Sequence, residues 1–246
     1  MTVNAIEAIR ADRAVLLDIC EALTEADWRA ASGCPGWSVH DLVTHMAITF
    51  WQFVDPSRFP DVSGVPAERM NDVNVEARRE WNSDKVLADY ENVSLDALEL
   101  MGTLLGLDLE IPLGDMGTYQ AAVLPSAWAF DHYTHIRADL FGPRGPLPGP
   151  PPPADEGRIG AALDWIAAAL PQQNSLAMPA CTLDLEIEGA GARTISFGHG
   201  RPAAVISSGA DSFIRWVTQR GRWADLDVRA AGDEAALAVA RGLRGF

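Results

Sequence analysis

The stretch Phe130-Asp131-His132-Tyr133-Thr134-His135 organises the first part of this chain. If it is helical, Asp131 and His135 lie four residues apart and project side by side from one face. The neighbouring positions on the same stripe are apolar: Leu124, Trp128 and Ala138. Two polar residues in an otherwise apolar row are the sharpest anomaly in the sequence, and they predict a polar site inside a group of packed helices.

A carboxylate and an imidazole at this spacing supply two ligands of a metal site, which needs a third ligand from another helix. His45 is the best candidate, because it adjoins Leu42 and Met46 on the apolar side of a predicted helix. Three protein ligands leave one position open, which is the catalytic rather than the structural arrangement. The alternative is that Asp131 and His135 form a buried hydrogen-bonded pair, and that His45 is a core histidine whose ring nitrogens are hydrogen-bonded.

The helix that carries His45 has clear end signals. Ser38 is a predicted N-cap, Asp41 completes a capping box with it, and Asp55-Pro56 ends the helix. Apolar residues at helical spacing predict further helices over residues 3–28, 66–106, 119–141 and 155–170. Within these, Asn82-Ser83-Asp84 marks a kink or a restart, and Pro125 marks a kink or the true start of its helix.

The pattern changes after a proline-rich segment, residues 142–154, which cannot be helix or central strand. Alternating apolar and polar residues predict strands over 182–188, 193–197, 203–207 and 226–228, with short helices over 212–219 and 233–243. The sequence therefore predicts an α+β protein of two domains. These are a helix bundle over residues 1–141 and a small α+β domain over residues 155–246, joined by a linker over residues 142–154.

Composition narrows the classes of partner. Acidic residues outnumber basic ones by 34 to 19, and the formal net charge of −15 repels nucleic acid and anionic membrane surfaces. The three cysteines form no CxxC pair and are typical of reduced thiols in the cytoplasm. No apolar run approaches the roughly 20 residues that span a bilayer, and the N-terminus lacks a signal peptide pattern. We expect a cytoplasmic protein; its oligomeric state does not follow from the sequence.

Residues 34–45 read CPGWSVHDLVTH. This segment resembles the Cys-Pro-Gly-Trp-Thr-Val-x-Asp-Leu-x-x-His signature of the mycothiol-dependent maleylpyruvate isomerase family. More loosely, Ser212–Val217, Gly221-Arg222 and Ala231–Asp233 resemble that family's C-terminal domain, which is similar to sterol carrier proteins. The resemblance spans nearly the whole chain. It implies a DinB-like, metal-binding, up-down four-helix bundle followed by a small α+β domain.

The resemblance also implies a ligand set. In the family a divalent metal, usually zinc, is held by a His of the second helix and by a Glu-x-x-x-His pair, and these positions correspond to His45, Asp131 and His135. Asp131 stands where the family has Glu, so the helices must approach more closely or the metal must shift. The family's Asp three residues after the second His is absent, because Ala138 occupies that position and Asp139 follows it.

By the same resemblance, the chain is an enzyme that uses mycothiol as a thiol cofactor. The metal favours the thiolate, which adds to a conjugated small molecule, and elimination after bond rotation gives cis–trans isomerisation. If the adduct is released instead, the enzyme is a mycothiol S-transferase of detoxification or biosynthesis. The rival is a non-catalytic small-molecule-binding protein with a degenerate metal site, favoured by Asp131 and the missing downstream acid.

Further residues have two interpretations each. His132 lies about 100° round the helix from Asp131 and is either a catalytic base, a supporting or replacement ligand, or a residue of the helix seam. Cys34 is either a nucleophile near a helix start or a structural residue. The arginines of the C-terminal region contact an anionic substrate or the thiol cofactor, or are ordinary surface residues: Arg220, Arg222 and Arg241.

Overall fold

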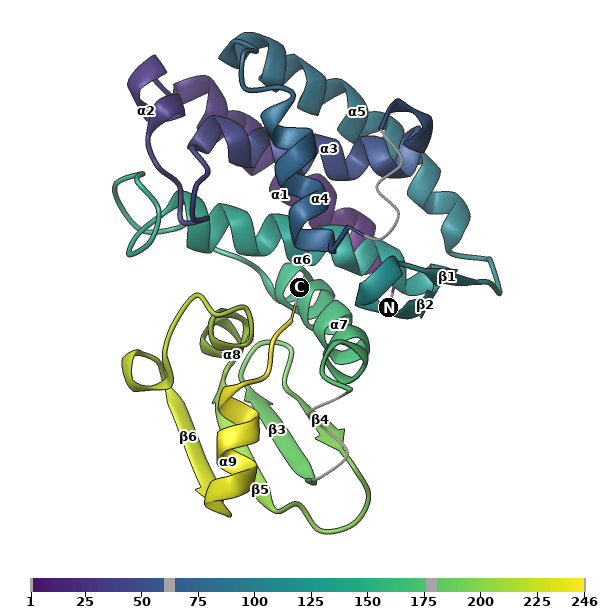
Figure 1. Cartoon of the computed structure of the whole chain (residues 1–246), viewed down its shortest axis with the longest axis vertical. Coiled ribbons are helices and arrows are strands. Elements are labelled where there is room, and N and C mark those ends of the chain that lie inside the picture. Colours follow the sequence, from purple (N-terminus) through teal and green to yellow (C-terminus); the bar gives the residue numbers. More distant parts are fainter. Residues whose placement is uncertain (1, 60–64, 176–180, 246) are drawn as a thin grey trace.

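The computed structural model describes residues 2–59, 65–175 and 181–245. Four helices pack together in the upper half of Figure 1 and share one apolar core: α1 (Thr2–Ala22), α3 (Val39–Val54), α5 (Ser83–Leu104) and α6 (Leu124–Thr134). Two shorter helices, α2 (Glu25–Arg29) and α4 (Ala67–Glu76), flank them. Each of the four presents buried apolar residues at helical spacing, which is why they assemble as a bundle.

Local capping sets where these helices begin. The single helix predicted over residues 3–28 is wrong, because Thr24 forms a capping box with Asp27 and starts α2 as a separate helix. Asn82 caps α5, so the predicted restart at Asn82-Ser83-Asp84 is confirmed. The described residues also contain short 3-10 turns: η1 (Pro56–Arg58), η2 (Gly114–Met116), η3 (Ala121–Val123) and η6 (Trp223–Asp225).

The helix predicted over residues 119–141 begins later than expected. An antiparallel hairpin of β1 (Glu110–Pro112) and β2 (Thr118–Gln120) takes its first residues, and Pro125 lies in the first turn of α6. Proline is tolerated there because the first N–H groups of a helix have no partner within it. After Thr134 the helix widens into a π-helical turn, η4 (His135–Leu140).

Helix α7 (Glu156–Gln173) lies between the bundle and the sheet in Figure 1. It begins at the N-cap Asp155, and Ala161 belongs to the bundle core. Leu163 and Ile166 belong to the core beneath the sheet. The domain boundaries stay a prediction, because α7 contributes to the cores on both sides of it.

The sheet has the strand order β4-β3-β5-β6, with β3 and β5 parallel and the outer pairs antiparallel. Its strands are β3 (Leu183–Glu188), β4 (Arg193–Phe197), β5 (Ala204–Gly209) and β6 (Val228–Gly232), and α8 (Ala210–Val217) and α9 (Glu234–Arg241) pack against it. Burial alternates along β3, as the sequence predicts. The fourth strand begins later than predicted, because η6 precedes it. A helix-rich N-terminal region with a small sheet-containing C-terminal region confirms the predicted fold class.

Within the described ranges, no helix combines the length and the apolar character that crossing a membrane requires.

Candidate metal centre

Helix α3 places His45 inside the bundle. Ser38 caps the helix by accepting a hydrogen bond from the Asp41 N–H, and the Asp41 carboxylate accepts one from the Ser38 N–H, so the predicted capping box is confirmed. His45 is 5% exposed. Its ring lies 5.0 Å from the Trp37 ring, centroid to centroid. The cap and the apolar stripe together orient His45 towards α6.

Helix α6 and the π turn present Asp131 and His135 to the same place. His45 Nε2 and His135 Nε2 each lie 3.3 Å from Asp131 Oδ1. The two imidazole rings meet edge to face at 5.2 Å. One ligand atom from each residue lies within 4.8 Å of the other two. The three residues that the sequence predicts as ligands therefore converge, although this proximity alone is also that of a hydrogen-bonded cluster.

Unpartnered atoms distinguish the two interpretations. Asp131 Oδ2 and His45 Nδ1 are buried and have no hydrogen-bond partner. Leaving a buried polar atom unpaired costs about 1–3 kcal/mol, so such an atom requires an explanation. A divalent cation would satisfy the free carboxylate oxygen, and two imidazoles with one carboxylate are a donor set that zinc accepts. The residues present therefore fit a metal ion.

Charge is distributed unevenly in this cluster. Burial alone would raise the pKa of Asp131, but the neighbouring His135 and His45 imidazoles overcome it and hold that pKa well below its ordinary value. Burial alone would lower the pKa of His135, but the Asp131 charge and the hydrogen bonds to Asp131 and Asp139 raise it well above its ordinary value. Without a metal, Asp131 and His135 thus form an ion pair, and a cation would take the place of the His135 proton.

Asp139 supports His135 from the other side. Its Oδ2 lies 2.8 Å from His135 Nδ1, which donates to it, and this leaves Nε2 directed at Asp131. Ligand histidines commonly donate their second N–H to a carboxylate in this way, which fixes the ring and its tautomer. Sequence reasoning discounted Asp139 because it lies four residues after His135. The sequence did contain a signal for Asp139: a second acidic residue four positions after His135 lies on the same face of a helix.

Asp139 is itself held by Arg220, from the segment after α8. Arg220 Nε lies 3.0 and 2.9 Å from the two carboxylate oxygens, and Nη2 lies 2.6 Å from Oδ2. Burial would raise the pKa of Asp139, but His135 and Arg220 hold it far below its ordinary value. The loop before α3 also approaches, since Gly33 N–H donates to the Asp139 carbonyl. A Cβ on Gly33 would lie 2.7 Å from the Asp139 Cα, so only glycine fits.

Cys34 borders this group. Its Sγ lies 3.4 Å from Asp139 Oδ2, 3.8 Å from His135 Nδ1 and 4.0 Å from Arg220 Nη2. The thiol can donate to the carboxylate, so its position agrees with a structural role. The contact with His135 leaves the nucleophile alternative open.

His132 lies next to Asp131, with its Nδ1 3.8 Å from Asp131 Oδ2, but both of its ring nitrogens have other hydrogen-bond partners. Its Nδ1–H donates to the Trp128 carbonyl at 2.9 Å, and its Nε2 accepts from the Tyr90 hydroxyl at 2.9 Å. Burial lowers the pKa of His132, which is therefore neutral. Because both nitrogens are occupied, the geometry favours the helix-seam interpretation over a base or a ligand.

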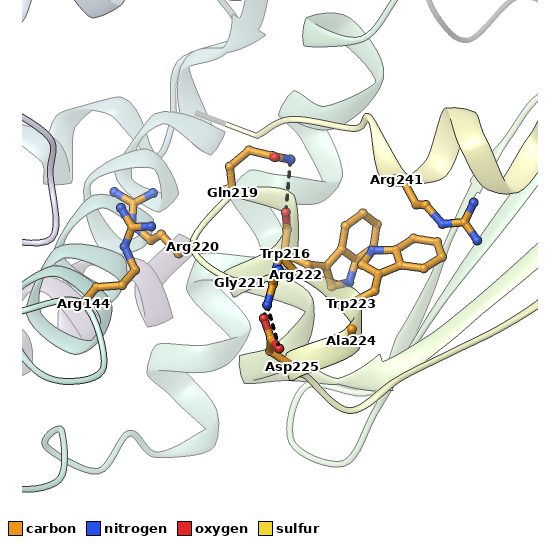
Figure 2. Close-up of a pocket in the computed structure, with 10 residues that line it drawn as sticks. All are labelled: Arg144, Trp216, Gln219, Arg220, Gly221, Arg222, Trp223, Ala224, Asp225 and Arg241. Carbon is orange, nitrogen blue, oxygen red and sulfur yellow. Dashed lines mark hydrogen bonds and ion pairs between the residues drawn. The ribbon is translucent and has the colours of Figure 1, made fainter.

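The three arginines predicted to contact substrate or cofactor have different surroundings. Arg220 reaches Asp139, as described, whereas Arg222 pairs with Asp225 at 2.7 Å and Arg241 pairs with Glu234 at 2.7 Å on the exposed surface. All three line one cavity, with Arg144 (Figure 2). Of the three predicted arginines, Arg220 alone pairs with Asp139, and Arg144 approaches the same carboxylate, with its Nε 3.8 Å from Asp139 Oδ1.

Residues 9–98 match the family model described as the Mycothiol maleylpyruvate isomerase N-terminal domain. The N-terminal region belongs to this family. The match contains His45 and the whole of α3. No curated protein matches the chain.

Two solved structures are similar over nearly the full length. One is the crystal structure of the mycothiol-dependent maleylpyruvate isomerase, with a TM-score of 0.61 and 16% identity, covering 95% of this chain and 94% of that chain. The other is a mutant of the mycothiol-dependent maleylpyruvate isomerase, with a TM-score of 0.61, 15% identity and the same coverage. At these identities the likeness shows a shared fold.

Proposed function

We propose that His45, Asp131 and His135 hold a divalent metal ion, zinc, in an enzyme that uses mycothiol to isomerise a conjugated small molecule. The observation that carries the proposal is the convergence of three ligand atoms around a carboxylate whose second, buried oxygen has no hydrogen-bond partner. The family of the N-terminal region supports the thiol cofactor, and a small-molecule substrate and a cytoplasmic location belong to the same proposal.

Each residue of the centre has a separate task. When bound, the metal would supply a positive charge that favours the thiolate form of a thiol at neutral pH. Asp139 keeps the second His135 proton on Nδ1, so Nε2 stays available as a ligand. Arg220 keeps Asp139 ionised and in place. Trp37 lies against His45 and limits water on that side of the ring.

The proposed reaction is a cis–trans isomerisation that returns the thiol unchanged. The alternative within the same chemistry is a mycothiol S-transferase, in which the thiol leaves with the product. The rival from another class is a non-catalytic small-molecule-binding protein, favoured by Asp131 in place of the family's Glu. The absence of the family's Asp three residues after the second His argues less strongly for this rival, because the Asp139 carboxylate lies beside His135 instead.

Metal analysis of the purified chain tests the enzyme proposal first. We expect about one equivalent of divalent metal, since three protein ligands make one site. His135→Ala is expected to lose both the metal and the activity. His199→Ala, a matched change at an exposed turn histidine, is expected to keep both. Less than about half an equivalent, unrestored by added zinc, would overturn the metal site, and a metal-replete, active His135→Ala would show the ligand assignment to be wrong.

Assays then separate the reactions. The metal-loaded chain is incubated with mycothiol and either maleylpyruvate or a generic electrophile, and the products are followed by chromatography and mass spectrometry. An isomerised product with the thiol regenerated supports the isomerase, and a stable thioether supports the S-transferase. A metal-loaded chain that binds these compounds without converting either one supports the non-catalytic rival.

A further inference from the structure

A cavity of about 490 Å³ opens beside the segment that follows α8. Its wall is formed by this segment, by Arg144 after η4, and by Arg241 of α9. None of His45, Asp131 and His135 lines it. The cavity is therefore a separate space, and two of its lining residues, Arg220 and Arg144, pair with Asp139 beside the candidate metal centre.

Positive charge is concentrated in this cavity. Of its ten lining residues four are arginines and one is acidic, Asp225. The chain as a whole has the opposite balance, with 19 basic and 34 acidic residues. A concave surface of one sign raises the local concentration of oppositely charged small molecules. The cavity therefore attracts anionic small molecules more than the acidic surface of the chain does on average.

Two of the arginines have partners that a ligand can replace. Arg222 and Arg241 pair with carboxylates at the surface, where both sides of each pair are at least 49% exposed. Such pairs contribute little to stability, because water solvates the separated charges well. Arg220 differs, since its side chain is 17% exposed and its partner Asp139 is fully buried. Arg222 and Arg241 are thus available to a ligand, and Arg220 is not.

Aromatic rings lie between the charged groups. The Trp216 and Trp223 rings meet edge to face at 5.4 Å, and the Arg241 guanidinium lies 5.2 Å from the Trp223 ring centre. In Figure 2 the Arg144 and Arg220 guanidiniums lie on one side and that of Arg241 on the other, with both indoles between them. This arrangement combines charge with an apolar surface.

The backbone of the same segment is strained. Gln219 has a φ of 60°, a conformation that side-chain-bearing residues rarely adopt. It is held there by hydrogen bonds from its side chain to the Trp216 and Leu243 carbonyls. Strain of this kind is found where a segment must present side chains in fixed directions. Here it turns the chain so that Arg220 faces Asp139 while Arg222 remains at the surface.

We propose that this cavity binds an organic anion, a carboxylate or a phosphate monoester with an aromatic body, outside the metal centre. The planar guanidiniums of Arg222 and Arg241 suit the two oxygens of either anionic group. Trp223 provides the face against which the aromatic body packs. The proposal goes beyond the metal and thiol chemistry, because it requires neither of them.

Calorimetric and tryptophan-fluorescence titrations test the site in the full chain, both zinc-free and zinc-loaded. The probes are benzoate, phenyl phosphate and neutral benzamide. We expect at least one anion to bind at least about tenfold more tightly than benzamide, with and without zinc. In the double variant Arg222→Met/Arg241→Met, that affinity is expected to fall at least about tenfold. Arg229→Met is the matched control, since Arg229 forms an exposed pair with Glu188 away from the cavity and should leave binding unchanged.

The titrations also identify the ligand group. Preference for benzoate assigns a carboxylate, and preference for phenyl phosphate assigns a phosphate ester. Equal binding of benzamide, or wild-type affinity in the double variant, would overturn the proposal. Binding that needs zinc and disappears in His135→Ala would also overturn it, by placing the anion at the metal. If the wild-type chain binds the anion but takes up no zinc, the cavity is supported while the proposed function fails, so the two failures are distinguishable.

Discussion

Asp131 and Asp139 lie four residues before and four residues after His135, and each contacts one nitrogen of its ring. Both oxygens of Asp139 are hydrogen-bonded, chiefly to Arg220. Asp131 contacts two imidazoles through Oδ1, and its buried Oδ2 has no hydrogen-bond partner, with His132 Nδ1 3.8 Å away. The same residue type beside the same ring is thus saturated on one side and unsaturated on the other.

The difference follows from which segments meet on each side. Asp139 joins three parts of the chain, because η4, the loop at Gly33 and the segment carrying Arg220 all contact it. Among the described residues, the side chains that pair with Asp131 are His45 of α3 and His132 and His135 of its own helix and the π turn that continues it. A saturated carboxylate that joins segments stabilises the fold, whereas an unsaturated one has capacity left for a cation. We therefore expect substitutions on the two sides to separate stability from metal binding.

Asp139→Asn should have the largest effect on stability. It leaves Arg220 without its charged partner in a buried place, and breaking a buried pair in this way costs about 3–5 kcal/mol. The measurement is urea denaturation of the zinc-free chain. Asp225→Asn, which removes the partner of exposed Arg222, is the control and should leave the unfolding midpoint unchanged. Equal effects of the two changes would contradict the distinction between the two sides.

Asp131→Asn should instead act on the metal. Loss of a ligand is expected to weaken zinc binding at least about 100-fold, beyond the roughly 10–100-fold typical of losing a supporting hydrogen bond. Zinc-free stability should fall less than in Asp139→Asn, because His135 keeps its bond to Asp139. Competition with a chromogenic chelator measures the affinity. Zinc affinity close to wild type would remove Asp131 from the ligand set.

Tyr90→Phe tests His132, a histidine whose two ring nitrogens both have hydrogen-bond partners. The change removes the donor to His132 Nε2 and leaves that nitrogen unpaired, at a cost of about 1–3 kcal/mol in the free energy of unfolding. Zinc content and activity per folded molecule should be unchanged, because the hydrogen bond that is lost does not involve any of the three candidate ligands. A change in the pH profile of activity would instead restore the interpretation of His132 as a base.

Asp41 shows how a saturated carboxylate outside the centre responds to acid. Burial acts to raise its pKa, but hydrogen bonds from His40 and Ser38 and the Arg79 charge lower it from 3.8 to about 2. A lowered folded-state pKa means that the stabilisation is fully present above pH 3.8 and is lost as the pH falls through about 2. The stability difference between wild type and Asp41→Asn, about 1 kcal/mol at neutral pH, should vanish over this window in denaturation titrations. A constant difference would mean that Asp41 contributes through packing alone.

Much of the fold was predictable because its signals are local. The cap at Ser38, the restart at Asn82 and the alternation along β3 each depend on residues within a few positions of one another. The wrong helix bounds came from local signals that the apolar periodicity obscured. Thr24 and Asp27 form a capping box that the apolar periodicity of residues 3–28 concealed. The hairpin of β1 and β2 carries too few apolar residues to show a strand period.

In the candidate site, too, some residues could be predicted from local spacing and others could not. Spacing on one helix pointed to Asp131 and His135, and family resemblance added weight to His45. Asp139 was discounted because the comparison used a fixed spacing of three residues. The pairing of Asp139 with Arg220 joins residues 81 positions apart, and no sequence period connects them. Arg222 and Arg241 could not be told from Arg220 by sequence, since all three are arginines in one region.

The sequence by itself determined the helices of the bundle, the strands of the sheet and a stripe on which Asp131 and His135 interrupt apolar residues. These depend on short-range sterics, capping and burial, which neighbouring residues decide. Only the tertiary structure decided that Asp139 is saturated while Asp131 keeps a free oxygen. That outcome depends on where Gly33 and Arg220 come to lie, and long-range packing sets the partners of a buried charge.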